Sequence, residues 1–243
     1  MERTGTVDKA VDLLFHLHEC AGPVGVTALG RALTMPKSSV HRLVNTLARK
    51  GLVERDDRGR YQPGANLVAL GLGVLDRDPT VACAQAVLPD FVDRAGETMF
   101  LVGARARSLI VLHKCEGTGL LRASPRIGSE VPVATTAAGA LYMAYAHEEF
   151  SPVEIAAGAD TDVAWLQERA ATAKRDGWSA NHELWQAGLS VIAAPVVVRG
   201  RMRAAVALAA SAARLQALGG DALAPLVVEA ANRIAERAQG AWS

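Results

Sequence analysis

The chain has 243 residues, of which 50% are hydrophobic, 5% aromatic and 21% charged. This composition is that of a globular protein with a real core, and it excludes a disordered or fibrous chain. The formal net charge is +1, but residues 1–64 carry ten Lys+Arg against seven Asp+Glu, while the remainder carries 16 against 18. The length suits one large domain or two small ones, and the basic excess lies at the N-terminal end.

Three cysteines, Cys20, Cys83 and Cys115, are odd in number and far apart, so neither a disulfide framework nor a Cys-x-x-Cys site follows. Residues 1–4 lack the apolar stretch of a signal peptide. The longest apolar run, residues 131–146, is shorter than the ~20 residues that span a bilayer and is interrupted by polar side chains. We therefore expect a soluble cytoplasmic protein with no membrane partner.

The first 64 residues predict three helices followed by a hairpin. A helix begins near Thr6, a short second helix follows with Thr27 as its N-cap, and Pro36 opens a third helix that Gly51 ends. Two short strands, residues 52–55 and 60–62, flank a polar turn. This order is typical of a winged helix-turn-helix.

The third predicted helix has two different sides. Val40, Leu43, Val44 and Leu47 form one apolar stripe, which predicts the buried side. The other side carries side chains that donate hydrogen bonds to phosphates and base edges: Lys37, Ser38, Ser39, His41, Arg42, Asn45, Thr46 and Arg49. No Asp or Glu occurs from residue 21 to residue 53, as expected of a surface that lies against phosphate.

A solvated amphipathic helix would show a similar pattern, but the order of the elements favours DNA binding. We predict that Ser38, Ser39, Arg42 and Asn45 meet base edges in the groove. The other residues predicted to contact double-stranded operator DNA, mainly at its phosphates, are Lys37, His41, Arg49 and the wing residues Arg58 and Arg60. The wing is the weaker part because Glu54, Asp56 and Asp57 dilute its charge.

Beyond the wing, the pattern predicts a linker helix within residues 65–79 and a second domain over residues 80–243. Helices are expected at 80–95, 136–146, 161–175 and 221–238, with a further helix opened by a capping box at Ser151–Glu154. Strands are expected at 98–103, 109–115, 189–198 and 202–210. Because short turns join adjacent strands, the sheet is antiparallel and the fold class is α+β.

Several spaced motifs resemble the IclR family of bacterial regulators. They include Val7–Leu14, Leu29–Leu33, Pro36–Leu47, the wing residues Tyr61–Gly64 with Leu70-Gly71, and in the second half Thr136–Leu141 and Gly188–Val196. The resemblance covers nearly the whole chain. It implies a GAF-like sensor as the second domain, a homodimer or a dimer of dimers on operator DNA, and control of a catabolic operon by a small organic effector.

By position in such a domain, the predicted effector-binding residues lie before the small-residue helix, in the loop 181–188 and on the last strands. They are Val133, Thr135, Thr136, Asn181, Val191, Ala207 and Ala209. Relatives that bind small carboxylates are expected to carry acidic and polar residues at several of these positions. The departure predicts a larger or less polar effector, such as an aromatic or weakly polar acid, although small apolar residues could equally pack the sheet.

No cofactor or metal is predicted. His16, His18 and Cys20 are spaced two apart on a helix and are expected to point to different sides. His113 and Cys115 share one side of a strand, which is too few ligands for a metal. An enzyme using His113 or Cys115 is an alternative, but no activating partner stands at motif spacing. Gly71-x-Gly73 lacks the context of a dinucleotide site.

The sequence thus predicts a non-enzymatic transcriptional regulator, with repression as the commoner mode. Two alternatives remain: an activator of the same family, and a DNA-binding protein whose second domain only dimerises.

Overall fold

The computed structural model describes residues 5–105, 107–119 and 125–241. The expectation about a signal peptide concerns residues 1–4 and lies outside this range. Contacts divide the chain into two compact units, Met1–Arg77 and Asp78–Ser243. Each unit has a hydrophobic core of its own. In the described part of the chain, no helix is both long enough and apolar enough to cross a bilayer.

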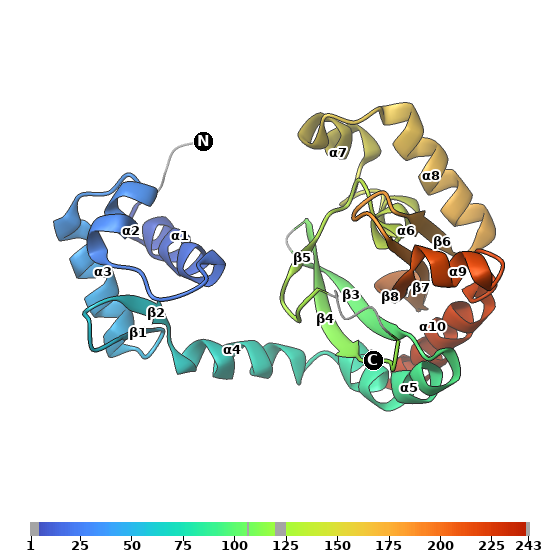
Figure 1. The fold of residues 1–243 in the computed structure, drawn as a ribbon, viewed down its shortest axis with the longest axis horizontal. Helices are drawn as coiled ribbons and strands as arrows, with labels where there is room; N and C mark the ends of the chain where they lie inside the picture. The colour runs from blue at the N-terminus through green and yellow to red at the C-terminus, as the bar shows by residue number, and fades with distance from the viewer. Residues whose placement is uncertain (1–4, 106, 120–124, 242–243) are drawn as a thin grey trace. The chain divides into compact units, whose positions relative to one another are not determined.

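The first unit is a winged helix-turn-helix, as predicted (Figure 1). Its elements are α1 (Gly5–Glu19), α2 (Val26–Ala32), α3 (Lys37–Arg49), β1 (Val53–Arg55), β2 (Tyr61–Pro63) and α4 (Ala65–Leu75). Leu13, Leu29, Val40 and Val44 are fully buried and hold the three N-terminal helices together. Val24 and Tyr61 exchange two backbone hydrogen bonds of 2.8 Å, which join the chain before α2 to the wing.

The predicted N-cap of the second helix is wrong. Gly25 is the N-cap and Val26 is already helical, because the Leu29 N–H donates to the Gly25 carbonyl at 3.0 Å. Pro36 is likewise the N-cap of α3, one residue before its first helical residue. The start of each helix is therefore set by where the first helical hydrogen bond can form, and not by which residue is the preferred N-cap.

The turn between α2 and α3 depends on a close backbone approach at Gly30. The Met35 N–H donates to the Gly30 carbonyl at 2.8 Å, and a Cβ on Gly30 would lie 2.9 Å from the Met35 carbonyl oxygen. Thr34 completes the turn with a φ of 52°, in the left-handed region. This turn sets where α3 begins and how its outer side is presented.

The second unit combines one antiparallel sheet with helices on both faces (Figure 1). Among the described residues the sheet has six strands in the order β5-β4-β3-β8-β7-β6. They are β3 (Thr98–Arg105), β4 (Ser108–Cys115), β5 (Glu130–Val131), β6 (Ser179–His182), β7 (Leu189–Val198) and β8 (Arg201–Ser211). The helices are α5 (Pro79–Ala95), α6 (Ala137–Tyr145), α7 (Pro152–Ala159), α8 (Val163–Asp176), α9 (Ala212–Ala217) and α10 (Ala224–Ala238), followed by the short η1 (Gln239–Ala241).

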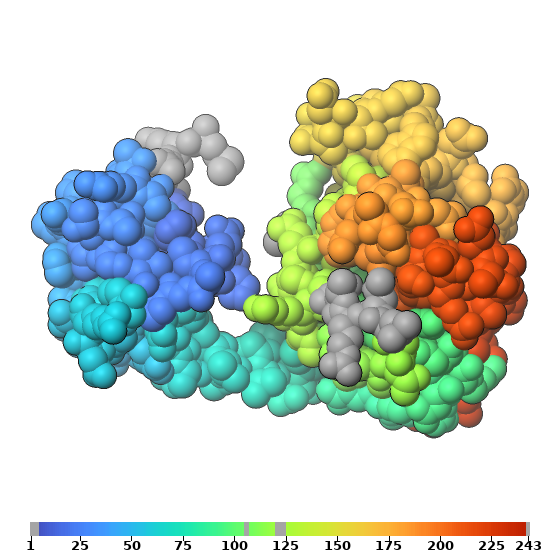
Figure 2. Space-filling model, in the orientation of Figure 1, coloured from blue at the N-terminus to red at the C-terminus, as the bar shows by residue number. Residues whose placement is uncertain are grey.

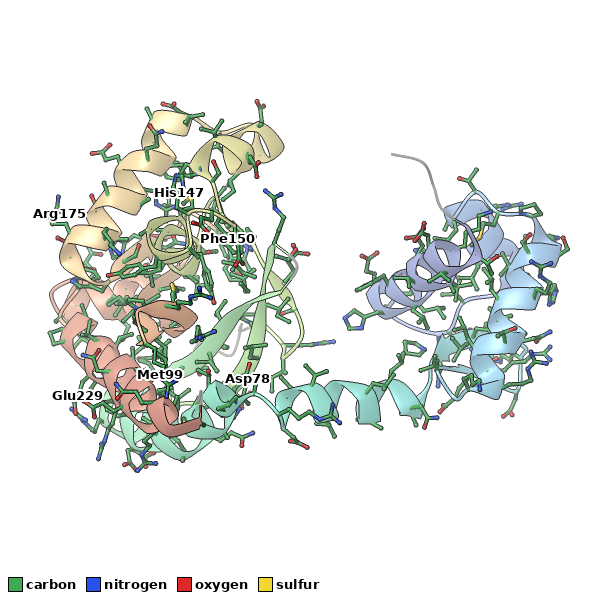
Figure 3. The ribbon with its side chains drawn as sticks, turned by 180° about the vertical axis from the view of Figure 1, so that it is seen from behind. Asp78, Met99, His147, Phe150, Arg175 and Glu229 are labelled. Atoms are coloured by element: carbon green, nitrogen blue, oxygen red, sulfur yellow. The ribbon has the colours of Figure 1, made fainter. Side chains whose placement is uncertain are left out.

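Strand alternation divides the core into two layers. Helices α5 and α10 cover one face of the sheet, and Met99 lies on that side (Figure 3). On the other face, Phe100 and Val102 pack with α6 and with Phe150, whose ring lies 5.1 Å from the ring of Tyr142. The Tyr142 hydroxyl donates to the Val102 carbonyl at 3.3 Å and so ties α6 to β3.

Besides the three-residue η1, three elements of this unit were not predicted. β5 has two residues and shows no periodicity, β6 is a polar edge strand, and α9 is a short helix capped by Ser211. The predicted capping box at Ser151 is wrong in part, since α7 begins there but the Ser151 side chain makes no capping hydrogen bond. Short edge elements carry too few residues for a sequence pattern to emerge.

The N-terminus of α6 rests on a close contact at Gly139. A Cβ at this position would lie only 1.8 Å from the Val133 carbonyl oxygen, so a side chain here would displace the segment before the helix. Thr136 caps the helix by accepting a hydrogen bond from the Gly139 N–H at 3.1 Å. Residues 133–139 therefore form one tightly folded unit.

We predict that Gly139→Ala destabilises the second unit by more than about 2 kcal/mol, because the backbone must move to relieve the clash. The matched control is Gly158→Ala in α7, where a Cβ meets nothing within 4 Å. That variant should be neutral or more stable by up to about 1 kcal/mol. Chemical denaturation measures both, and equal behaviour of the two variants would contradict the contact.

Candidate functional site

The outer side of α3 is a continuous row of polar donors. With about 100° per residue, Ser38, Arg42, Asn45 and Arg49 follow one line along the helix, opposite the buried Val40, Leu43, Val44 and Leu47. All four donors are exposed. Lys37 and His41 are exposed on one flank of this line, whereas Ser39 is half-buried on the other. The structure thus brings the predicted α3 residues together but places Ser39 at the margin.

Thr46, beside this row, makes hydrogen bonds to two of its residues. The Thr46 hydroxyl donates to the Arg42 carbonyl at 2.9 Å, and an Arg49 guanidinium nitrogen lies 3.4 Å from the same hydroxyl. These contacts reduce the rotamer freedom of Arg49, so less conformational entropy is lost when it binds an anion.

Acidic residues of the wing form hydrogen bonds and an ion pair that stabilise its turn and its junction with α4. Asp56 accepts hydrogen bonds from the backbone N–H of Arg60 at 2.8 Å and of Arg58 at 3.0 Å, and it pairs with the Arg60 guanidinium at 2.7 Å. The Arg60 N–H, and then its guanidinium, lower the pKa of Asp56. Glu54 accepts the Ala65 N–H at 2.9 Å at the start of α4.

The two predicted wing arginines therefore differ. The guanidinium of Arg60 is engaged by Asp56 within the protein, whereas Arg58 is exposed at the tip of the turn. Two of the three carboxylates that dilute the wing's charge in the sequence, Glu54 and Asp56, bind backbone N–H groups at the start of α4 and in the turn, which the sequence pattern did not reveal.

The second unit contains a narrow cavity between the α6 face of the sheet and the N-terminal end of α6. The space there that is not filled by protein atoms is about 420 Å³, a figure that includes open solvent. The described residues that line it are almost all apolar: Phe100, Val102, Val111, Pro125, Val131, Thr136, Ala138, Trp185, Leu189, Val191, Ala207 and Ala209. The small side chains on β8 leave the space that larger residues would fill.

The structure brings four of the seven predicted residues into this lining: Thr136, Val191, Ala207 and Ala209. Val133, Thr135 and Asn181 do not line the cavity. Val133 and Thr135 instead belong to the segment before α6, which forms one wall of the cavity. The Asn181 side chain supports this wall through a hydrogen bond to it.

One support of the wall is Arg169 on α8. Its guanidinium donates to the Ala134 carbonyl at 2.5 Å and to the Thr136 carbonyl at 3.0 Å, and it stacks 4.7 Å from the Trp165 ring. Burial lowers the pKa of Arg169. The cation thus fixes the residues on both sides of Thr135, where the chain enters α6.

A second support is Asn181 on β6, which is 2% exposed. Its amide donates to the Thr135 carbonyl at 2.7 Å and accepts the Leu184 N–H at 2.9 Å. One side chain therefore links the segment before α6 to the loop that carries Trp185. An aspartate here would face the Thr135 carbonyl with a second acceptor and break this link.

Sequence reasoning missed most of the sheet residues of the lining. Phe100 and Val102 are two residues apart on β3 and therefore share a face of the sheet. This spacing could have placed them on the same face as Ala207 and Ala209. Trp185 lines the cavity, whereas Trp165 stacks on Arg169. The pattern alone did not separate these two tryptophans.

The structure also corrects the view of His16 and Cys20. His16 lies near the end of α1 and Cys20 directly follows the helix, so the spacing of four residues brings them together, and the Cys20 sulfur lies 3.8 Å from the His16 Nε2. Within residues 5–105, 107–119 and 125–241, no three His, Cys, Asp or Glu side chains gather as metal ligands. Burial raises the pKa of Cys115 and lowers that of His113, which is the opposite of an activated thiolate.

Two family models together match nearly the whole chain. Residues 6–57 match the IclR helix-turn-helix domain, and residues 72–236 match the bacterial transcriptional regulator IclR C-terminal domain. The chain belongs to the IclR family. Members of the IclR family are non-enzymatic DNA-binding regulators of transcription, so the alternative of an enzyme is wrong and this chain is a transcriptional regulator.

Relatives within the IclR family align over most of their length. The chain is 30% identical to the glycerol operon regulatory protein of Streptomyces coelicolor, over 74% of this chain and 73% of the relative. It is 27% identical to the DNA-binding transcriptional repressor YiaJ of Escherichia coli, over 91% and 79%. The crystal structure of an IclR homolog from Microbacterium hydrocarbonoxydans, complexed with 4-hydroxybenzoate, shares the fold with a TM-score of 0.81 at 21% identity, over 97% and 100%.

Proposed function

We propose that this regulator represses a catabolic operon and releases its operator when a small, weakly polar aromatic acid occupies the cavity. The observation that carries the proposal is the apolar cavity between Ala207, Ala209 and the start of α6, within a DNA-binding regulator. The relative described as a transcriptional repressor supports repression, and the regulatory protein of the glycerol operon supports control of a catabolic operon. The homolog that binds 4-hydroxybenzoate supports the class of effector.

The output of the regulator is the outer side of α3. Ser38, Arg42 and Asn45 lie on its most exposed line and are the residues proposed to read base edges in the major groove. A guanidinium pairs well with guanine and an amide with adenine, which assigns sequence selectivity to Arg42 and Asn45. The remaining proposed contacts, mainly to phosphates, are those of Lys37, Ser39, His41, Arg49, Arg58 and Arg60, with Arg60 the weakest because Asp56 already holds it.

The input is proposed to be the apolar cavity. The aromatic rings of Phe100 and Trp185 and the small side chains of β8 favour a flat, apolar ligand body. The N–H groups of Ala137 and Ala138, in the first turn of α6, have no partner within the helix and can donate to a polar group of the ligand. Val133, Thr135 and Asn181 are proposed to act on the effector through the wall that they hold.

We further propose that two copies pair through the first unit. Helix α4 has no buried residue, and Val68, Leu70, Leu72 and Val74 on it are 54% to 62% exposed. In the space-filling view, the visible face of α4 is not covered by the rest of the first unit (Figure 2). Helix α1 adds an exposed apolar stripe of Val7, Val11 and Phe15. Apolar surface of this extent marks an interaction site, and a pair of copies can bind the two half-sites of a palindromic operator.

DNA reading by α3 is tested with a duplex selected from random sequences by the wild-type protein. Arg42→Ala should weaken binding by about tenfold or more and relax the preference at one base pair. Lys37→Ala should weaken binding to all sequences alike and reduce the salt slope by about one. Arg199→Ala, in the β7–β8 turn, is the charge-matched control. Unchanged affinity and preference in Arg42→Ala would remove its assigned role.

Effector binding in the cavity is tested with thermal shifts on a panel of benzoates. A ligand at 100 times its dissociation constant should stabilise the native protein by about 2.7 kcal/mol. Ala209→Leu fills the cavity and should abolish the shift, with Ala209→Val as a milder variant, whereas Ala171→Leu on the exposed side of α8 should retain it. If no compound shifts the wild type, the second unit only mediates association. If Ala209→Leu keeps the shift, the effector binds elsewhere.

Pairing through α4 is tested by sedimentation of the full chain. Leu70→Glu should lower the mass of the largest species by half, because the charge cannot be buried in an apolar interface. It should not lower monomer stability, since Leu70 is 62% exposed. Val153→Glu, at an exposed apolar position of α7, is the control and should leave the mass unchanged. An unchanged mass in Leu70→Glu places the interface on another surface.

A further inference from the structure

A charged side chain on β4 stands next to the cavity. Lys114 pairs directly with Phe100 on β3, and paired residues of an antiparallel sheet share a face. Since Phe100 lines the cavity, Lys114 lies on the cavity's face of the sheet, one strand further out. Its side chain is only 19% exposed, so its stem is largely covered by protein.

The ammonium group of Lys114 forms an ion pair with a carboxylate that is accessible to water. The Lys114 Nζ lies 2.5 Å from the Glu116 Oε1, and the Glu116 side chain is 71% exposed. An exposed carboxylate is well hydrated when it leaves its partner, and an ion pair of this kind contributes little to stability. A ligand carboxylate that arrives through the apolar cavity can therefore replace Glu116 at modest cost.

The described lining of the cavity supplies no counter-charge for a ligand anion. None of the described lining residues is charged, and an anion buried in such surroundings is unfavourable unless a cation pairs with it. The four-carbon stem of a lysine can carry its ammonium group across the neighbouring Phe100 to the edge of the cavity. Arg169, a cation that supports the segment before α6, is engaged by two backbone carbonyls.

We infer that Lys114 selects effectors that carry a carboxylate, by forming with that group the ion pair it otherwise forms with Glu116. This inference rests on the proposed function, because it presumes an effector in the cavity. The acid group then lies at the β4 side, and the other polar end of the ligand faces the N–H groups of Ala137 and Ala138 at the start of α6. The cavity selects carboxylic acids over uncharged molecules of the same shape.

The experiment compares each acid with its neutral isostere by calorimetry on the full chain: benzoate with benzamide, and 4-hydroxybenzoate with 4-hydroxybenzamide. The wild type should prefer the acids by about tenfold or more, the range expected for a hydrogen bond between charged groups. Lys114→Met should lose this preference while keeping its affinity for the amides. Lys114→Arg should retain the preference, and Glu116→Gln should bind the acids more tightly than the wild type does.

Lys174→Met is the matched control, because Lys174 lies 3.7 Å from the ring of Tyr145, away from the cavity lining, and this variant should keep the preference for acids. Melting curves without ligand confirm that each variant folds. Equal affinity of the wild type for acid and amide, or an acid preference that survives in Lys114→Met, would overturn the role of Lys114 and leave the cavity proposal standing. Absence of binding by all four compounds would overturn both.

Discussion

The Val133 carbonyl rests against the Cα of Gly139, and the architecture of the second unit depends on this contact. It allows the chain to fold back sharply before α6, so that Thr136 can cap the helix and also donate to the Pro132 carbonyl at 2.6 Å. Arg169, on α8, donates to the carbonyls of Ala134 and Thr136. Asn181, on β6, donates to the carbonyl of Thr135. The result is a rigid wall without regular secondary structure, and the cavity lies between this wall and the sheet.

The sheet supplies the opposite wall through small side chains. Ala207 and Ala209 face α6 from the central strand β8, and their methyl groups do not reach across the gap. On the other face of the same strands, larger residues such as Met99 and Leu208 pack against α5 and α10. The sheet therefore has one tightly packed face that provides stability and one loosely packed face that can take a ligand.

Charge is used differently in the two units. In the first unit two acidic side chains of the wing are engaged by the protein, because Asp56 holds Arg60 and Glu54 accepts the first N–H of α4. The α3 surface, which contains no carboxylate, is left with an uncompensated positive potential toward DNA. In the second unit Lys114 stands beside Phe100 of the apolar lining and Arg169 holds the segment before α6, and a charge next to apolar surroundings has a larger effect than one at the surface.

The sequence by itself determined the order of the longer elements, the polar and apolar sides of α3, the antiparallel sheet and the family. Each of these depends on a local period or on neighbouring residues, as with Val40, Leu43, Val44 and Leu47 on one side of a helix. Only the tertiary structure decided that Asn181 supports the wall rather than lining it, that Asp56 engages Arg60, and that Lys114 stands beside Phe100. These relations join residues from different strands, helices and loops. Strand register and close backbone contacts bring such residues together, and no local sequence pattern encodes either of them.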